Sequence, residues 1–404
     1  MSVLIINNFS RARYSEMLPE IKNQLVVLSY CDLEDSDEFL YFERISYSQL
    51  SSYVVIRALE LYERYQFESV IADDEYDLIN AGLIREKLNI KGQTVESAIA
   101  FRDKVVMKDY LSKKLNVPPY RRLHSVKDLY EFIEQYSYPV IIKPIDQGAS
   151  RGIYVLYNNE DLKDFSKISW ETNWEVEKFV EGEMYHIDAL VEDGNIVTLS
   201  VSKYLNGCLA FQDNQNLGSY QLHPNELMFD RLRELFKEVL ENLPHPPVSV
   251  YHLEVFHTNK DEFFVCEIAS RIGGGLISNL VLETYGIDLG VYWFRSICNL
   301  PNNEGEKEYI DTVKGFMYIP PRYGTLKSVP KDVDFPFVTS YKVVAKPLQK
   351  YDKASRSIDR ICEVVIEGTD SKDLENKLIQ LSEWFADQIK WDIESKIETE
   401  RAVL

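Results

Sequence analysis

The most constraining feature of the sequence is a pair of apolar strands that carry one glutamate each and are followed by an arginine and three glycines. Glu254 lies in an expected strand over 250–257 and Glu267 in another over 262–268, and the short turn between them allows antiparallel pairing with both carboxylates on one face. Two acidic groups held that close repel unless a cation lies between them. Mg²⁺, bound by one or two carboxylates and completed by substrate phosphates, is the natural occupant. Taken alone, the pair fits equally well as exposed charges on alternating strand faces.

The segment after the second glutamate favours the metal interpretation. Arg271 follows Glu267 by four residues and precedes three consecutive glycines. This arrangement offers a bidentate cation and exposed backbone N–H groups to an anion. Consecutive glycines inside a strand or helix would cost about 0.5–1 kcal/mol each. A flexible linker is disfavoured because apolar Ile272 and Leu276 flank the glycines.

Two lysines and a glycine-containing loop suit the same anionic ligand. Lys143 ends an apolar strand, where an ammonium group without an anionic partner would be costly. Lys104 lies near the start of an expected helix, where a surface lysine is the commoner interpretation. The loop 146–152 joins two strands into an expected hairpin whose tip can fold over a ligand.

Segment 175–182 is a strand followed by a turn, with alternating charged and apolar residues. By itself it is a weak signal for recognition of an adenine edge by the backbone at Lys178 to Val180. Glu183 is the nearby carboxylate that we expect to meet ribose hydroxyls.

Three units follow from the order of expected elements. Strand-like and helix-like runs alternate over 1–95, which predicts an α/β domain with a parallel sheet. No GxGxxG follows its first strand, so a dinucleotide-binding domain is not supported. Residues 96–304 hold the motifs above, and 305–404 predict a smaller α+β unit. The acidic segment 31–43 is expected to be a solvated loop.

Composition removes several classes of partner. The 404 residues include 45 Lys and Arg and 65 Asp and Glu, a formal charge of −20. Such a surplus argues against sequence-independent binding to nucleic acid or to an anionic membrane, and no apolar run reaches the roughly 18 residues of a membrane span. The 5 cysteines are scattered and form no CxxC pair, so we expect neither a disulfide framework nor a zinc site. This use of cysteine is typical of a reducing compartment, and we expect a cytoplasmic protein.

In their order along the chain, these motifs resemble the ATP-grasp superfamily of carboxylate ligases. The resemblance covers roughly residues 95–300. The run Glu-Ile-Ala-Ser-Arg-Ile-Gly-Gly-Gly from Glu267 is most similar to the amino-acid and peptide ligase group, which includes carnosine synthase, bacterial dipeptide ligases and ligases of antibiotic biosynthesis. The resemblance implies an ATP-grasp fold of α/β and α+β class, with an N-terminal Rossmann-like domain and a small C-terminal α+β domain.

The resemblance also implies roles for individual residues. The implied ATP-binding residues are Lys104, Lys143, Gly148, Ser150, Gly152, Glu177, Lys178, Val180 and Glu183; the implied ligands of Mg²⁺ or Mn²⁺ are Glu254 and Glu267; the implied catalytic residues are Arg271 and Lys143. Two positions depart from the family pattern. Ala269 stands where many members have a metal-binding asparagine, and Met184 stands where many have the ribose-binding glutamate.

The implied reaction is phosphorylation of an amino-acid carboxylate by ATP, followed by transfer of the acyl group to an amine. Alternatives are transfer to a carrier-protein thiol, as in antibiotic biosynthesis, a non-catalytic nucleotide-binding module, and a carboxylase-type enzyme, although no biotin-attachment Met-Lys-Met is present. We expect residues 203–223 to line the acceptor pocket, with an ordinary surface loop as the alternative. A buried, hydrogen-bonded side chain is expected for His186, and a homodimer is possible.

Overall fold

Four parallel strands open the chain. The computed structural model describes residues 2–46, 52–148, 150–168, 173–210, 214–302 and 310–392. The strands are β1 (Ser2–Asn7), β2 (Leu25–Ser29), β3 (Tyr41–Arg44) and β4 (Phe67–Ala72), arranged in the order β3-β2-β1-β4. The parallel α/β unit predicted from the sequence is confirmed.

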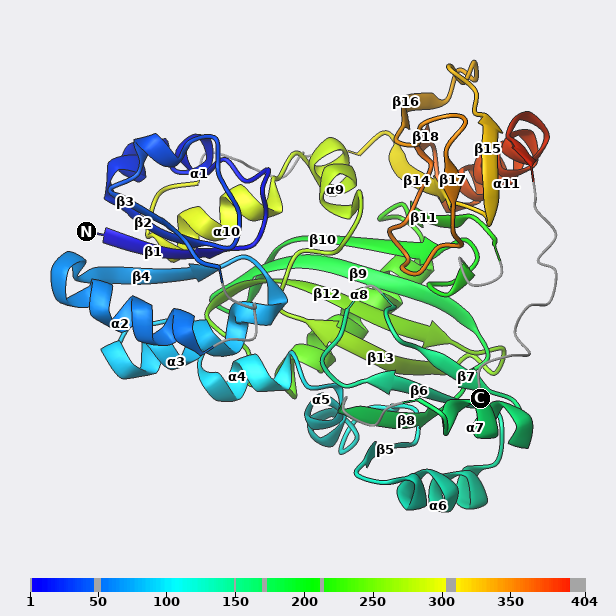
Figure 1. Cartoon of the computed structure of the whole chain (residues 1–404), viewed down its shortest axis with the longest axis horizontal. Coiled ribbons are helices and arrows are strands. Elements are labelled where there is room, and N and C mark those ends of the chain that lie inside the picture. The colour runs from blue at the N-terminus through cyan, green and yellow to red at the C-terminus, as the bar shows by residue number, and fades with distance from the viewer. Residues whose placement is uncertain are drawn as a thin grey trace.

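Both faces of this sheet are covered, because successive side chains of a strand point to opposite faces. Leu4 and Ile6 pack toward α2 (Tyr53–Tyr65) and α3 (Leu78–Leu88). Val3 and Ile5 pack on the other face, in a cluster that includes Trp293 and Phe294 of α10 (Leu289–Ile297). Figure 1 shows α10 and the short α1 (Tyr14–Met17) on one side of these strands and α2 and α3 on the other. A helix from late in the chain thus completes the core of the first unit.

The prediction of a solvated loop over 31–43 is wrong at its end and in part of its middle. Residues 41–43 belong to β3, which pairs in parallel with β2. Asp35 is 5% exposed and accepts a hydrogen bond from the backbone N–H of Ser15 at 2.8 Å. The acidic residues concealed a short edge strand because Tyr41 and Phe42 give too brief an apolar run to stand out.

An eight-stranded antiparallel sheet forms the centre of the molecule (Figure 1). Its order is β13-β12-β9-β10-β11-β14-β18-β16. The strands are β9 (Glu183–Glu192), β10 (Asn195–Tyr204), β11 (Leu217–Gln221), β12 (Val248–His257), β13 (Phe263–Ala269), β14 (Val313–Ile319), β16 (Val338–Val343) and β18 (Cys362–Gly368). Strands from both sides of the expected boundary at 304–305 share this sheet, and the boundary itself stays a prediction.

A second antiparallel sheet, β5-β8-β6-β7, lies beside the edge strand β13 in Figure 1. It consists of β5 (Tyr120–Leu123), β6 (Val140–Pro144), β7 (Tyr154–Leu156) and β8 (Trp174–Lys178), and it packs on α6 (Val126–Tyr136) and α7 (Asn159–Phe165). The predicted hairpin across loop 146–152 is confirmed, since β6 and β7 pair antiparallel. The loop itself is described except for residue 149.

The remaining elements cover the central sheet. Helix α8 (Leu227–Glu241) buries its apolar side on β9, β10 and β12, together with α4 (Val95–Ala100) and α5 (Lys104–Leu111). Helix α9 (Ile277–Tyr285) follows the glycines, and α11 (Ser371–Gln388) packs on β14 and β18. A small sheet of β15 (Gly324–Ser328), β17 (Lys350–Tyr351) and β19 (Lys390–Asp392) completes the C-terminal part.

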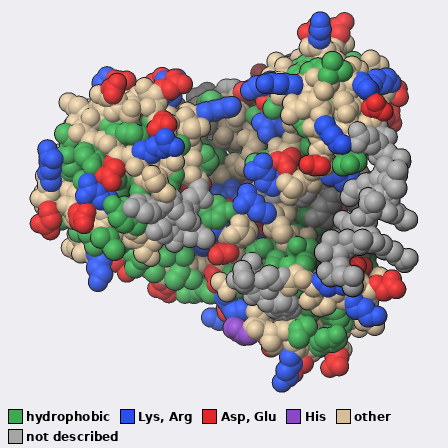
Figure 2. Space-filling view, in the orientation of Figure 1, with side chains coloured by type: hydrophobic (Ala, Val, Ile, Leu, Met, Phe, Trp, Pro, Cys, Tyr) green, Lys and Arg blue, Asp and Glu red, His purple; other side chains and the backbone are tan. Residues whose placement is uncertain are grey.

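Three properties of the whole molecule bear on function. Among the described residues, no helix is both long and apolar enough to cross a bilayer. Figure 2 shows a hollow in the surface of the molecule, with Lys and Arg side chains gathered around it. All five cysteines are free thiols.

Candidate active site

The two glutamates predicted as metal ligands lie opposite each other. Glu254 of β12 and Glu267 of β13 are directly paired across the antiparallel ladder. The Tyr204 hydroxyl donates a hydrogen bond to Glu254 Oε1 at 2.8 Å, and Lys104 Nζ lies 3.2 Å from Glu267 Oε2. Burial raises the pKa of Glu267, but Lys104 and Lys143 outweigh it and lower the pKa to about 2. Glu267 can therefore offer charged oxygens to a cation, and Glu254 lies directly opposite it on the paired strand.

Lys143 belongs to a buried network of two lysines and two glutamates. Its Nζ lies 2.8 Å from Glu177 Oε1 and 3.8 Å from Glu175 Oε1. Lys108 of α5 is fully buried and lies 2.9 Å from Glu175 and 2.8 Å from Glu177. Burial alone would lower the pKa of Lys143, but Cys266 and the two carboxylates raise it well above its ordinary value. The network is charge-balanced, as buried ionic groups require.

Sequence reasoning missed Lys108 and Glu175. A signal was present, because Lys108 falls on the same helix side as Val105 and Leu111, which are both buried. Glu175 and Glu177 are two residues apart on β8 and so share one face of that strand. The expected contact of Glu177 with adenine is not tested by this geometry, which places its carboxylate between two ammonium groups.

Arg271 is fixed by a carboxylate from the first sheet. Its Nε lies 2.8 Å from Oε2 of Glu75, just beyond β4, and its Nη1 donates to the backbone oxygen of Ile272. Arg102 approaches the same carboxylate at 3.6 Å. Burial raises the pKa of Glu75, but Arg271 and Arg102 lower it below its ordinary value. Sequence reasoning did not single out Glu75, which meets Arg271 only through the tertiary fold.

The glycine run is required by a close approach. A Cβ atom added at Gly273 would lie 2.4 Å from Asp188 Oδ1 and 3.0 Å from His252 Nδ1. Gly275 has a φ of +71°, a conformation that side chains disfavour, whereas Gly274 has open space around it. The run therefore turns tightly over the carboxylate of Asp188.

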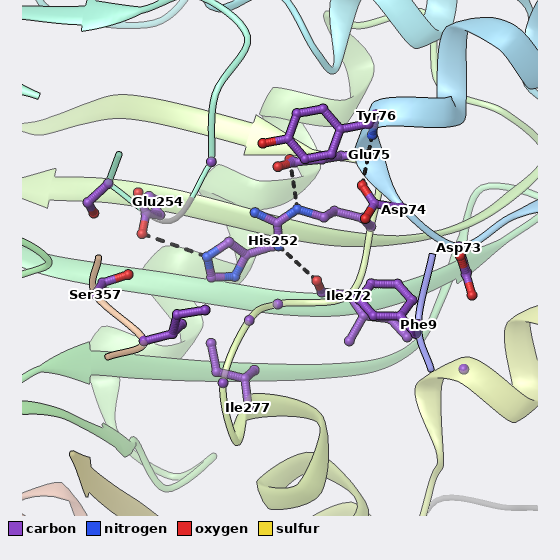
Figure 3. A pocket seen from close by; sticks show the side chains of 18 of the residues that line it. Phe9, Asp73, Asp74, Glu75, Tyr76, His252, Glu254, Ile272, Ile277 and Ser357 are labelled. Atoms are coloured by element: carbon purple, nitrogen blue, oxygen red, sulfur yellow. Dashed lines mark hydrogen bonds and ion pairs between the residues drawn. The ribbon is translucent and has the colours of Figure 1, made fainter. Parts of the chain in front are cut away.

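Asp188 joins two histidines in a buried chain of hydrogen bonds. Asp188 Oδ2 lies 2.6 Å from His186 Nδ1, and Oδ1 lies 2.8 Å from His252 Nδ1. The second ring nitrogen of His186 meets Ser219, so the expected hydrogen-bonded histidine is confirmed. His252 Nε2 points toward Glu254, 3.7 Å from Oε1 (Figure 3). Burial lowers the pKa of His252, but Asp188 outweighs it and raises the pKa to about 10.

The ligand atoms of His186, Asp188 and His252 lie within 4.8 Å of one another, close enough to hold a metal ion. The separations of 2.6 and 2.8 Å are, however, those of direct hydrogen bonds. We interpret the three residues as a hydrogen-bonded network that holds His252 in place beside Glu254.

These groups surround a cavity of about 610 Å³. Its lining includes Gly148, Ser150, Glu254, Glu267 and Arg271, five of the residues predicted from the sequence, together with the three glycines. A wall formed by Asp73, Asp74, Glu75 and Tyr76 and an apolar set formed by Phe9, Met17, Phe294, Phe316 and Tyr318 complete it. Figure 3 shows the acidic wall and Glu254 projecting from different elements toward the same space.

Other predicted residues lie outside this lining. Lys104 Nζ donates to the backbone oxygen of Gln147 at 2.9 Å, which links it to the glycine-containing loop. Lys178 Nζ donates to the Tyr138 backbone oxygen at 3.0 Å, and Glu183 accepts from Lys203 at 2.6 Å. The positions that the cavity does not include are Lys104, Lys143, Gly152, Glu177, Lys178, Val180 and Glu183. Their roles toward ATP stay predictions.

The segment predicted to line an acceptor pocket contributes to the cavity through Tyr204, Cys208 and Leu217. Residues 211–213 of this segment lie outside the described residues. The nature of the group that the segment meets stays a prediction.

Comparison with known proteins matches residues 136–279 to the ATP-grasp domain family. The L-arginine-specific L-amino acid ligase of Bacillus subtilis is 27% identical over 287 residues, 67% of this chain and 67% of that protein. A D-alanine–D-alanine ligase of Clostridium botulinum is 26% identical over 147 residues, 30% of this chain and 49% of that protein.

Solved structures share the fold over almost the whole chain. The L-amino acid ligase of Bacillus licheniformis superposes with a TM-score of 0.73 at 16% identity, covering 98% of this chain and 99% of that one. Carboxyaminoimidazole ribonucleotide synthase of Aspergillus clavatus, complexed with ATP, gives a TM-score of 0.70 at 14% identity, covering 95% and 99%. The predicted resemblance and the predicted fold are confirmed: residues 136–279 match the ATP-grasp domain family, and the chain is similar to amino acid ligases in sequence and in fold.

Proposed function

We propose that this protein is an ATP-dependent ligase that activates the carboxylate of an amino acid and joins it to an amine. The observation that carries the proposal is the convergence of Glu254, Glu267 and Arg271 on one cavity. Paired carboxylates suit a divalent cation, and an arginine beside them suits the anionic groups that such a reaction brings together.

The residues present fit the ligands of the family. Glu254 and Glu267 would hold Mg²⁺ or Mn²⁺, which when bound offsets the charge of the triphosphate. Lys104 and Lys143 are the cations that we assign to phosphate oxygens. Lys104 already contacts the backbone of the loop that carries Gly148, Ser150 and Gly152, so one residue can link phosphate binding to the position of the loop. The adenine assignments to Glu177, Lys178 and Val180, and the ribose assignment to Glu183, belong to the same proposal.

The reaction balances in two steps. A substrate carboxylate oxygen forms a bond to the γ-phosphorus of ATP while the bond from that phosphorus to the β–γ bridging oxygen breaks, giving an acyl phosphate and ADP. The amine nitrogen then bonds to the acyl carbon, the carbon–oxygen bond to phosphate breaks, and the amine releases a proton. Arg271, held by Glu75, would stabilise the negative charge that develops on the acyl group.

The acceptor is the less constrained half of the proposal. The names of the relatives, an L-amino acid ligase and D-alanine–D-alanine ligases, favour the amine of a second amino acid over a carrier-protein thiol. The same relatives support a small amino acid-like donor, and the B. subtilis relative is named for L-arginine. Cytoplasmic location, antibiotic biosynthesis and a homodimer stay predictions.

Release of ADP tests the proposal. The purified protein, with ATP and MgCl₂, is screened against pairs of amino acids, against single amino acids, and against single amino acids with a phosphopantetheinylated carrier protein. We expect ADP with pairs of amino acids, and a loss of at least 100-fold in rate for Glu267→Gln. Glu262→Gln, an exposed glutamate in the turn between the same strands, is the matched control and should keep the rate. ADP release that requires the carrier protein would replace the amine by the thiol, and a Glu267→Gln variant that keeps the wild-type rate would refute the proposal.

A further inference from the structure

Two carboxylates on the cavity wall, Asp73 and Asp74, form no ion pair within the described residues, and Asp73 also has an oxygen without a hydrogen-bond partner. Asp73, Asp74 and Glu75 follow β4 and all line the cavity. Glu75 is paired with Arg271, and Asp74 is held by two hydrogen bonds. Asp73 accepts a hydrogen bond from the Tyr14 hydroxyl through Oδ2, while its Oδ1 is shielded from solvent and has no hydrogen-bond partner within the described residues.

The surroundings of Asp73 make the absence of a neighbouring cation unfavourable in free energy. No Lys, Arg or His of the described part of the chain forms an ion pair with it, and Asp74 and Asp77 add negative charge nearby. Burial, with these neighbours, raises the pKa of Asp73 to about 7, against the hydrogen bonds from Tyr14 and from the Asn8 backbone, which lower it. A carboxylate with a solvent-shielded oxygen and no cation is unfavourable, and a positively charged ligand group would relieve the cost.

A second unpartnered group lies on the same cavity. Tyr318 of β14 is 1% exposed, lines the cavity, and its hydroxyl has no hydrogen-bond partner among the described residues. A buried hydroxyl in this state calls for a ligand atom or water. Two polar atoms at the cavity, Asp73 Oδ1 and the Tyr318 hydroxyl, therefore lack a hydrogen-bond partner among the described residues. They belong to segments far apart in the sequence.

Apolar side chains accompany Asp73. Phe9, Met17 and Phe294 line the cavity. The ring centroid of Phe294 lies 6.2 Å from that of Tyr14, whose hydroxyl donates to Asp73. Such surroundings suit a cation carried on a methylene stem, because the stem packs on apolar surface while the charged head meets the carboxylate.

The position of Asp73 indicates which cation it meets. Figure 3 shows Asp73 and Phe9 at one side of the cavity and Glu254 at the other, with Glu75 between them; Glu75 is the partner of Arg271. The α-ammonium group of an amino acid is only two bonds from its carboxyl carbon, so it stays near the reacting centre. A cation at Asp73 would belong to the far end of a longer side chain.

We propose that Asp73 binds the side-chain guanidinium or ammonium group of a basic amino acid, so that the protein selects cationic amino acids as substrates. The proposal rests on the ligase function above and names its substrate class. Asp73 would be a specificity-determining residue that contacts substrate without taking part in bond making.

Binding to neutral analogues of the same shape tests the charge directly. Isothermal titration calorimetry on the purified full chain with MgCl₂ and a non-hydrolysable ATP analogue compares L-arginine with L-citrulline. We expect L-arginine to bind at least tenfold more tightly, Asp73→Asn to reduce the ratio below threefold, and Asp77→Asn to keep it. Asp77 is a matched control because it is a buried aspartate of the same segment, its pKa is also raised to about 7, and it is not in the cavity lining.

Each outcome decides between the two proposals. A wild-type ratio near one, or a ratio that survives Asp73→Asn, would overturn the cation site. If Asp73→Asn does not fold, L-lysine against L-norleucine in the wild-type protein decides in its place, and equal affinities would overturn the site. A preference for L-arginine without ADP release from any amino acid pair would leave the cation site standing and remove the ligase function. ADP release at equal rates with arginine and with citrulline would leave the ligase function standing and overturn the cation site.

Discussion

The glycine run over Asp188 gives a sharp test of the site, because its three members have different neighbours. Replacing Gly273 by alanine adds a carbon 2.4 Å from Asp188 Oδ1, 3.0 Å from His252 Nδ1 and 3.1 Å from Ile277 Cδ1. Contacts of 2.4 Å are not tolerated, so the carboxylate or the glycine backbone has to move.

The cost follows from what holds Asp188. Its carboxylate is 1% exposed and hydrogen-bonded to two buried histidines at 2.6 and 2.8 Å. Movement breaks at least one charge-assisted hydrogen bond, worth about 1.5–3 kcal/mol. Crowding a packed site adds about 1–3 kcal/mol. We therefore expect Gly273→Ala to lower the free energy of unfolding by about 2.5–6 kcal/mol. We also expect it to reduce ADP release, because His252 Nε2 lies 3.7 Å from Oε1 of Glu254.

Gly274→Ala is the control within the same run. Nothing lies within 4 Å of an added Cβ there, so its effect should stay within about 0.5 kcal/mol. Urea unfolding followed by circular dichroism, with ADP release on the same samples, measures both variants. Equal unfolding midpoints for Gly273→Ala and Gly274→Ala would refute the reasoning from the close approach.

Three further predictions concern the rest of the fold. Lys108→Met leaves Glu175 without its nearest cation and should cost about 3–5 kcal/mol in urea unfolding; a change below about 1 kcal/mol would contradict the buried network. Burial raises the pKa of Asp77 from 3.8 to about 7, so the folded protein retains a proton that the unfolded chain releases. Stability should fall as pH rises from about 4 to 7, by at most ~4 kcal/mol, and comparison of Asp77→Asn with wild type across this range should show that part of the slope lost. Gly152→Ala, at a φ of +70°, should lower the thermal midpoint through a backbone cost of about 1–2 kcal/mol, and an unchanged midpoint would contradict it.

Much of the fold could be predicted from local pattern. The strands around Glu254 and Glu267 were predictable because both are apolar runs and the turn between them fixes an antiparallel register. The parallel first sheet followed from alternation of strands and helices. Strand β11 and the short strands β15, β17 and β19 were not predicted, because two to five residues in the middle of polar segments give no periodicity to recognise.

The missed parts of the site depend on contacts between distant segments. Glu75 and Asp73 follow a strand of the first sheet, and nothing near them in sequence indicates that Arg271 or the cavity lies beside them. Burial of Lys108 is likewise a tertiary property, since a lysine on a helix is usually solvated. The sequence thus predicted Glu254, Glu267 and Arg271, which line the cavity, and missed the lining residues whose place depends on the tertiary fold.

The balance of charge around Lys143 constrains how it can serve a phosphate. Lys143 and Lys108 face Glu175 and Glu177, two cations against two anions, all at most 4% exposed. If Lys143 left for a phosphate group, the buried set would keep one uncompensated negative charge, at a cost of about 3–5 kcal/mol for breaking such a pair. An ammonium group has three donors, so it can keep Glu177 and donate to a phosphate oxygen as well. We therefore expect Lys143 to act from its present position, with the nucleotide and the loop 146–152 brought to it, so that the lysine contributes to binding without giving up its place in the core.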